Sequence, residues 1–157
     1  SLKDNAGVYL IPAFTGFGCP YWDPEARGAI YGLTRDTGPE QFTRAALESV
    51  AYQTRDLFKA MSDDGIDPKK IRVDGGMTAN ESFLQILADS LQKEVAKPSN
   101  TESTALGACI VCQIADGVAM EEIKTLIESK YRSNSKLNNF YKKDYEDWKM
   151  FIDSSLN

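Results

Sequence analysis

The sequence predicts an α/β fold, in which short strands alternate with amphipathic helices. The main observation is the segment IRVDGGMTANESF, residues 71–83, which has the pattern of a short strand, a diglycine and a helix start. A second observation is that apolar residues recur at helical spacing on both sides of this segment. The third is length, because 157 residues, of which 42% are hydrophobic, are enough to enclose a core.

The first part of the chain predicts two extended segments with a long loop between them. Val8–Phe14 is expected to form a strand, and residues 29–34 (AIYGLT) a second extended segment. The loop, residues 15–28, is dense in Gly, Pro and Asp. We expect it to be ordered, because it contains apolar anchors of its own: Phe17, Tyr21 and Trp22.

A long helix is predicted to begin at Thr37–Glu40 and to continue to Gly65. Thr37 and Glu40 have the spacing of a capping box, and the proline between them suits a first helical turn. One face of this helix is apolar, and we expect it to be buried: Phe42, Ala46, Val50, Leu57, Phe58 and Met61.

The middle of the chain predicts a second strand–helix pair. Ile71–Asp74 has the alternation of a short strand, and a helix is expected over about residues 79–92. Thr78 and Glu81 have the spacing of another capping box, which places the helix start close to the diglycine.

The diglycine is the principal candidate binding site. Ligands of open α/β sheets bind outside the carboxyl ends of strands. At this position Gly75 and Gly76 would let a flat ring or a phosphate approach the backbone, and Asn80 would offer both a donor and an acceptor. The alternative is a turn that needs glycine only for its backbone angles and binds nothing, with Asn80 as a favourable helix-start residue.

The segment after this helix predicts a strand and a buried helix. Glu94–Lys97 is the strand, and Ser99–Glu102 is a third helix-start signal. The helix that follows is apolar nearly all round as far as Gly117, so we expect it to be central. Cys109 and Cys112 are therefore expected to be reduced core residues rather than a redox or zinc pair.

The remaining chain predicts two further helices. Met120–Tyr131 has an amphipathic, solvent-facing pattern, and a polar connector follows it. The last helix is expected at Tyr141–Leu156, with its inner face formed by Tyr145, Trp148, Phe151 and Ile152.

Composition removes several function classes. The net charge is −5 and basic residues do not cluster, so nucleic acid is not an expected partner. Histidine is absent, which removes the commonest general base and most catalytic zinc sites. Three cysteines, an odd number, fit a reducing compartment. With no apolar run long enough to cross a bilayer, we expect a cytoplasmic protein without membrane insertion.

The acidic residues near the candidate site do not predict catalysis. Asp23 and Glu25 lie in a turn where Asp supports the backbone, and Asp74 is expected to shape the diglycine turn. We therefore predict no catalytic and no metal-binding residue in the chain. Its amino-terminal start, directly in a strand-like run, suggests a piece of a longer chain or an unseen leader.

Four segments form a specific combination: PAFTGFGCPYWDPEARGAIYGLTR at 12–35, FTRAALESVAYQTRD at 42–56, RVDGGMTAN at 72–80 and TESTALGA at 101–108. Together they resemble the glycerol kinases of the FGGY carbohydrate kinase family. The similarity runs from Gly7 to about Gly117 and weakens beyond it.

The resemblance implies a ribonuclease H-like fold of the actin-like ATPase type. Residues 1–157 would be the carboxyl-terminal part of the second domain, with the upstream strands and the entire N-terminal domain absent. Gly76 and Asn80 would contact the adenine nucleotide, with Gly75 beside them. The phosphate loop, the glycerol-binding residues and the catalytic base would all lie upstream.

The activity implied by the resemblance is ATP-dependent conversion of glycerol to glycerol 3-phosphate. ATP and Mg²⁺ are the implied cofactors, with Mg²⁺ held mainly by groups outside this chain, and the full-length enzyme is expected to be a homo-oligomer. The isolated chain is expected to be inactive. Two alternatives remain: a non-catalytic nucleotide-binding or interaction module, and a kinase of the same family acting on another polyol or sugar.

Overall fold

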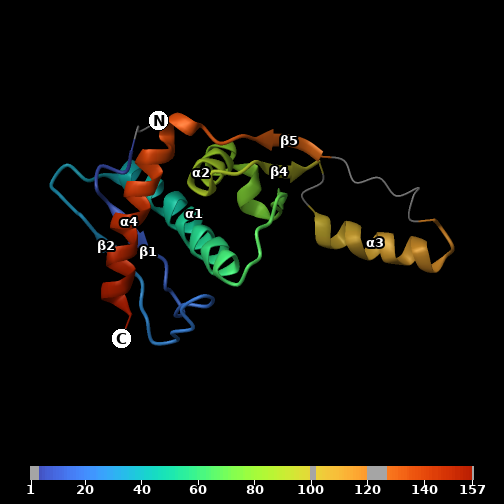
Figure 1. Ribbon diagram of the computed structural model, residues 1–157, viewed down its shortest axis with the longest axis horizontal. Helices are drawn as coiled ribbons and strands as arrows, with labels where there is room; N and C mark the ends of the chain where they lie inside the picture. Colours follow the sequence, from blue (N-terminus) through green and yellow to red (C-terminus); the bar gives the residue numbers. More distant parts are fainter. Residues whose placement is uncertain (1–3, 100–101, 120–126, 157) are drawn as a thin grey trace.

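The computed structural model describes residues 4–99, 102–119 and 127–156 and confirms the predicted α/β class (Figure 1). The strands are β1 (Tyr9–Ile11), β2 (Ala29–Tyr31), β3 (Ile71–Arg72), β4 (Val95–Pro98) and β5 (Ile127–Tyr131). The α-helices are α1 (Pro39–Asp63), α2 (Glu81–Leu91), α3 (Ser103–Ala115) and α4 (Asn138–Ser155). Two short 3₁₀ turns are η1 (Gly76–Ala79) and η3 (Ser135–Leu137).

The strands form two small sheets. β1 and β2 are antiparallel, with Tyr9 opposite Tyr31. The second sheet has the order β3-β4-β5, in which β3 is parallel to β4 and β5 is antiparallel to it. Parallel pairing of β3 with β4 requires a crossover, which α2 provides. The diglycine follows β3 after two residues, Val73 and Asp74, and therefore lies beyond the carboxyl end of a strand, as predicted.

The core lies where α1, α2, α4 and β1 meet, and Figure 1 shows α4 running alongside α1 and β1. Trp148 of α4 is fully buried, and its indole Nε1 donates a hydrogen bond to the carbonyl oxygen of Leu10 at 2.8 Å. This bond satisfies the one polar atom of a large aromatic side chain. The predicted inner face of the last helix is confirmed: Tyr145, Trp148 and Ile152 are buried, and Phe151 is half-buried.

The start of α1 differs from the predicted capping box by one residue. Gly38 precedes the helix, and Gln41 Oε1 accepts a hydrogen bond from the Gly38 N–H at 2.9 Å. The hydroxyl of Thr37 instead accepts from the Thr34 N–H at 2.9 Å, within the preceding turn. The proline was placed correctly, because Pro39 is the first helical residue.

The buried face of α1 also differs from the prediction. Phe42 and Leu57 are 38% and 39% exposed, whereas Glu48, Tyr52 and Asp56 are buried. A count of apolar residues cannot identify this face, because its polar groups become buried only with partners from distant elements.

In the loop 15–28, the predicted anchors divide. Phe17 is buried and its ring lies 5.1 Å from that of Tyr21. Trp22 was wrongly predicted as an anchor, since it has a positive φ of 51° and is 74% exposed.

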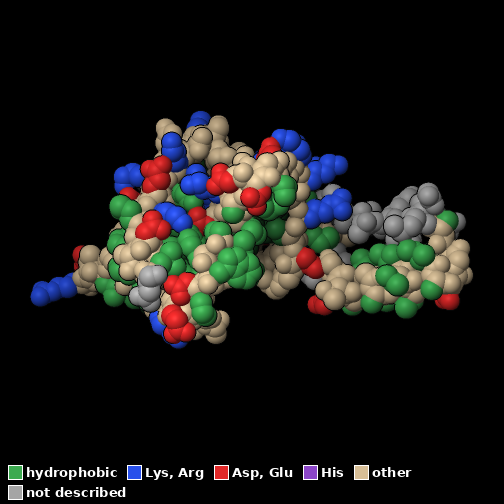
Figure 2. Space-filling view, turned by 60° about the horizontal axis from the view of Figure 1, so that its bottom comes forward, with side chains coloured by type: hydrophobic (Ala, Val, Ile, Leu, Met, Phe, Trp, Pro, Cys, Tyr) green, Lys and Arg blue, Asp and Glu red, His purple; other side chains and the backbone are tan. Residues whose placement is uncertain are grey.

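The prediction that α3 is a buried central helix is wrong. None of its described side chains is buried, both of its cysteines are exposed, and Val111 is 67% exposed. Figure 1 shows α3 extending away from the other elements, and Figure 2 shows hydrophobic side chains along it. An apolar helix is buried only if another part of the protein packs against it. Within the described ranges no element packs extensively against α3.

The predicted helix at Met120–Tyr131 is also wrong over its last part. Residues 127–131 form β5, which pairs with β4 through Tyr131 opposite Val95 and Lys130 opposite Ala96. Backbone pairing with a neighbouring strand has overridden the helical pattern. Residues 120–126 lie outside the described residues. In the part of the chain that is described, no helix is both long and apolar enough to cross a bilayer.

Candidate functional site

The diglycine turn lies just beyond β3. This strand ends at Arg72, two residues earlier than the predicted end at Asp74. The Val73 N–H still donates to the Ala96 carbonyl at 3.1 Å, so the chain follows β4 for one more residue. Gly75 then has φ +96° and ψ 173°, a conformation that essentially only glycine adopts. The turn therefore requires glycine at this position for its backbone shape.

Gly76 is glycine without such a requirement. Its φ is not in the left-handed region, and a Cβ added to it would meet no atom within 4 Å. Both glycines are exposed. The described chain thus leaves open space on the outer side of Gly76 that a side chain would enter.

The predicted Thr78–Glu81 capping box is wrong, because Thr78 belongs to the 3₁₀ turn η1 that precedes the helix. Its side chain is 2% exposed, and its hydroxyl donates to the Gly75 carbonyl at 2.7 Å. Its backbone N–H donates to the same carbonyl at 3.0 Å. Thr78 therefore closes the turn instead of starting the helix.

Asn80 is the residue that caps α2. Its Oδ1 accepts a hydrogen bond from the Phe83 N–H at 3.1 Å, which satisfies one of the free donors of the first helical turn. The interpretation of Asn80 as a helix-start residue is confirmed. Its side chain is exposed, and its Nδ2 donors have no hydrogen-bond partner among the residues that the structure describes. The cap thus uses the oxygen of the amide and leaves the nitrogen side available.

Asp74 connects this turn to α3. Its carboxylate accepts hydrogen bonds from the hydroxyl and the backbone N–H of Ser103, the first residue of α3, and from the Gly75 N–H. The hydroxyl of Ser103 is the largest of the causes that hold the pKa of the Asp74 carboxyl below its ordinary value. The structure therefore brings all three predicted site residues, Gly75, Gly76 and Asn80, to one exposed turn beside the start of α3.

Buried carboxyl groups were not recognised from the sequence. Glu48 is 1% exposed, and its Oε1 accepts from Arg44 Nε at 2.5 Å. Burial raises the pKa of Glu48 to about 7, although Arg44 acts in the opposite direction. Asn5 Nδ2 donates to both Glu48 Oε2, at 3.0 Å, and Asp144 Oδ2, at 3.1 Å.

A second buried group holds the loop 15–28 in place. Asp56 accepts hydrogen bonds from the hydroxyls of Tyr21 and Tyr145, the latter at 2.5 Å. Lys149 Nζ lies 4.3 Å from the centre of the Tyr21 ring and 3.8 Å from Asp56 Oδ1. These carboxyl groups have internal partners, so their arrangement supports a structural role. For Glu48 and Asp56, the sequence signal is their helical spacing: with Tyr52 between them, they recur every four residues on the buried side of α1.

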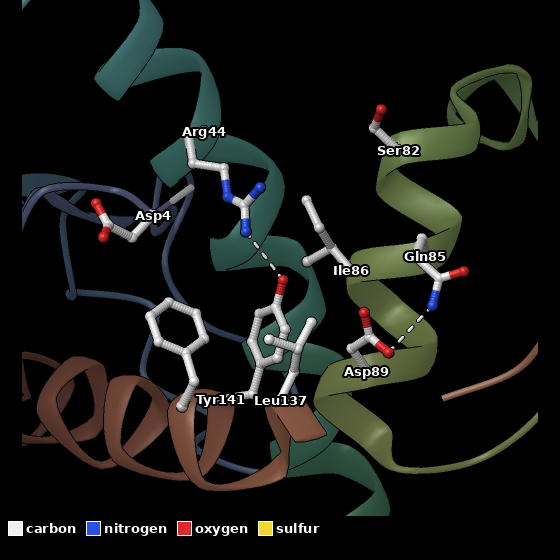
Figure 3. Close-up of a pocket in the computed structure, with 9 residues that line it drawn as sticks. Asp4, Arg44, Ser82, Gln85, Ile86, Asp89, Leu137 and Tyr141 are labelled. Atoms are coloured by element: carbon white, nitrogen blue, oxygen red, sulfur yellow. Dashed lines mark hydrogen bonds between the residues drawn. The ribbon is translucent and has the colours of Figure 1, made fainter. Parts of the chain in front are cut away.

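The pocket drawn in Figure 3 lies between α1, α2 and the start of α4, and has a volume of about 460 Å³. Arg44 and Gln85 project into it, but both are hydrogen-bonded, Arg44 to Tyr141 at 2.9 Å and Gln85 to Asp89 at 3.0 Å. None of the predicted site residues lines it. The diglycine turn and this pocket are therefore separate features of the surface.

No group of three or more His, Cys, Asp or Glu side chains is placed to hold a metal ion within residues 4–99, 102–119 and 127–156. The carboxylate of Asp74, directly before the turn, is hydrogen-bonded to Ser103 and Gly75. The turn fits a flat or extended organic group better than a cation, because it offers open backbone and an amide donor.

Comparison with known proteins gives a consistent picture. Residues 2–115 match the C-terminal domain of the FGGY family of carbohydrate kinases. The glycerol kinase of Alteromonas mediterranea is 55% identical over 116 residues, which cover 74% of this chain and 24% of that protein. The glycerol kinase of Pseudomonas fluorescens is 48% identical over 157 residues, covering 96% of this chain and 31% of that protein.

The structural comparison extends over the whole chain. The crystal structure of Plasmodium falciparum glycerol kinase with ADP superposes with a TM-score of 0.83 and 28% sequence identity. The match covers 99% of this chain and 32% of that protein. The matched part of the chain thus spans about a quarter to a third of the length of the proteins it resembles.

Proposed function

Because the chain belongs to the FGGY family of carbohydrate kinases, we propose that it is part of an ATP-dependent glycerol kinase, which converts glycerol to glycerol 3-phosphate. Identities of 55% and 48% to two proteins named glycerol kinase support glycerol over another polyol or a sugar. The superposition on a glycerol kinase that holds ADP supports an adenine nucleotide as the second substrate.

In this proposal residues 1–157 form the carboxyl-terminal part of the enzyme's second domain. Two features support an incomplete domain. β3 pairs with β4 on one side only among the described strands, and α3 presents an apolar surface that nothing described covers. The part of the polypeptide that precedes this segment in whole kinases would pack on both.

The single observation that carries the nucleotide role is Gly76. A glycine with ordinary backbone angles and open space beside it has no conformational purpose within the described chain. A nucleotide base lying against this backbone gives it one, since any side chain would occupy the space of the ring. Gly75 shapes the turn, and Asn80 Nδ2 donates to an acceptor of the nucleotide while Oδ1 keeps the helix cap.

The chain would not contain a complete active site. ATP, when bound, supplies the phosphoryl group, and phosphoryl transfer depends on positioning and on charge around the phosphates and Mg²⁺. The carboxyl groups of Glu48, Asp56 and Asp144 are buried with internal partners and do not reach the diglycine turn. The base, the phosphate loops, the groups that hold Mg²⁺ and the glycerol site would come from the preceding part of the enzyme.

The test is a titration of the isotope-labelled chain with ADP, followed by backbone amide NMR. We expect weak binding, with a dissociation constant on the order of 1 mM, because only part of the nucleotide has partners here. Amide shifts should centre on Asp74 to Glu81. Shifts centred on the pocket of Figure 3, or no shifts at saturating ADP, would contradict the proposal.

A matched pair of variants sharpens this test. Gly76→Val places a branched side chain where the base would lie, and should abolish the ADP-induced shifts. Gly18→Val is the control, because Gly18 also lacks a positive φ and also has no atom within 4 Å of an added Cβ. The control should bind ADP as the unmodified chain does.

A further inference from the structure

Both backbone polar groups of Gly75, the N–H and the carbonyl, are hydrogen-bonded. Its N–H donates to the Asp74 carboxylate, and its carbonyl accepts from both the hydroxyl and the backbone N–H of Thr78, at 2.7 and 3.0 Å. Thr78 is buried, whereas Gly75, Gly76 and Asn80 are exposed. The hydroxyl that fixes the turn thus lies on its inner side, and the outer side stays open.

The same Asp74 carboxylate also contacts the start of α3. It accepts two hydrogen bonds from Ser103, one from the hydroxyl and one from the backbone. Within the described ranges α3 has no buried side chain and no extensive contact with another element. Its start is therefore oriented by this polar contact to the diglycine turn more than by apolar packing.

We propose that Asp74 and Thr78 are positioning residues that set the Gly75–Gly76 turn, together with the start of α3, before a nucleotide binds. The proposal rests on the adenine-nucleotide function proposed above and deepens it. A ligand that meets a turn already in its bound shape loses less affinity to the ordering of the chain. Neither side chain needs to touch the nucleotide to raise its affinity in this way, because both act through hydrogen bonds to Gly75.

Thr78 gives the sharper test, because two near-isosteric substitutions separate its hydroxyl from its volume. Thr78→Val removes the hydroxyl and keeps the branched shape, whereas Thr78→Ser keeps the hydroxyl. We expect Thr78→Val to raise the dissociation constant for ADP about two- to tenfold, which is the effect of one hydrogen bond. Thr78→Ser should keep most of the affinity of the unmodified chain. Ser103→Ala and Ser103→Thr should form a second pair with the same order.

The control is Thr54→Val in α1. The Thr54 hydroxyl donates to the Val50 carbonyl at 2.8 Å. This variant therefore loses a comparable hydrogen bond from a side chain to the backbone, but within α1 and outside the diglycine turn. ADP affinity should not change in it. An equal loss of affinity in Thr54→Val, or in Thr78→Ser, would show that the Thr78 hydroxyl has no specific role and would overturn the proposal.

A second readout needs no nucleotide. Amide hydrogen exchange of the free chain should be several-fold faster at Thr78 and Asn80 in Thr78→Val, about as expected for a loosened local turn, and unchanged in Thr54→Val. If the unmodified chain fails to bind ADP, the proposed function is wrong, and exchange alone then decides the positioning role. Unchanged exchange at Gly75–Asn80 in both Thr78→Val and Ser103→Ala would overturn it.

Discussion

The hydroxyl of Tyr52, on α1, donates a hydrogen bond to Asp144 Oδ2, on α4, across 92 positions of sequence. Asp144 Oδ1 also accepts from the hydroxyl of Tyr9, on β1, at 2.8 Å. One carboxyl group thus joins the three elements that surround the core. Burial and the negative neighbour raise the pKa of both tyrosines, so their hydroxyls remain protonated donors over the whole physiological range.

This arrangement predicts a large stability cost for removing the acceptor. Asp144→Ala removes the acceptor of the buried Tyr52 hydroxyl, the shorter of two contacts of the Tyr9 hydroxyl and one of two acceptors of the Asn5 amide, and should lower the free energy of unfolding by about 3–5 kcal/mol. Tyr52→Phe removes one donor and should cost about 1–3 kcal/mol. Urea denaturation followed by circular dichroism measures both. Tyr31→Phe is the control, because its hydroxyl is bonded to serine hydroxyls near the end of α4 and the residue is only half-buried. A cost equal to that of Tyr52→Phe would contradict the assignment.

Stability should fall as pH rises from about 5 to above 7. The ordinary pKa of Glu48 is 4.5 and burial raises it to about 7, so between these values the unfolded chain releases a proton that the folded chain keeps. The pKa of Asp144 is also raised by burial and acts in the same direction. Denaturation midpoints measured from pH 5 to 8 test this sign. Glu48→Gln should flatten the profile, and a stability that rises over this range would contradict the burial argument.

Asn80 caps α2 and, in the proposed function, also contacts the nucleotide, and two substitutions separate these roles. Asn80→Ala removes the cap of α2 and should lower the free energy of unfolding by about 1 kcal/mol. Asn80→Asp keeps an oxygen that can accept from Phe83 and places a favourable charge at a helix start, but removes the amide donor. It should therefore keep the stability and weaken ADP binding. If Asn80→Asp binds ADP as well as the unmodified chain, the amide does not contact the nucleotide.

The three cysteines should react rapidly with a thiol reagent in the native chain. Cys19, Cys109 and Cys112 are all exposed. In a complete kinase that covers α3, Cys109 and Cys112 should react slowly, while Cys19 is the internal reference within the chain. Slow native labelling of the two α3 cysteines in the isolated chain would mean that α3 is covered there as well.

The isolated chain should produce no glycerol 3-phosphate above background from ATP, Mg²⁺ and glycerol. The reason is that, in the proposed enzyme, this chain would contribute nucleotide contacts only, without the base and the phosphate loops. A coupled assay measures this, with a whole glycerol kinase as the positive control. Sustained turnover by residues 1–157 alone would show that the proposed division of the active site is wrong.

Local signals were sufficient for much of the fold. The strand before the diglycine, the helix after it and the inner face of the last helix were predicted, because periodicity and breakers report local structure. The sequence allowed either Thr78 or Asn80 to start the helix and could not decide between them. Both residue types cap helices, and the choice depends on whether the backbone enters a 3₁₀ turn first.

Other features depend on contacts that no local pattern contains. β5 exists because β4 lies beside it, and the buried Glu48 and Asp144 depend on Asn5, which both accept from. The exposure of α3 is the opposite case, since its composition predicts burial and the described chain offers no surface to bury it. The composition of α3 therefore predicts burial, but whether its side chains are buried depends on whether another element packs against them.

The uncovered surface of α3 also bears on how long such a chain survives in a cell. Val111 at 67% exposure and Ile114 at 40% place branched apolar side chains in water, and surfaces of this kind attract chaperones, proteases and other exposed apolar surfaces. A folded core does not protect against this, because the attraction needs no unfolding. The abundance of the chain in a cell would therefore depend on how quickly another protein surface packs on α3. A charged residue in place of Val111 would lengthen the lifetime of the chain and leave the core unchanged.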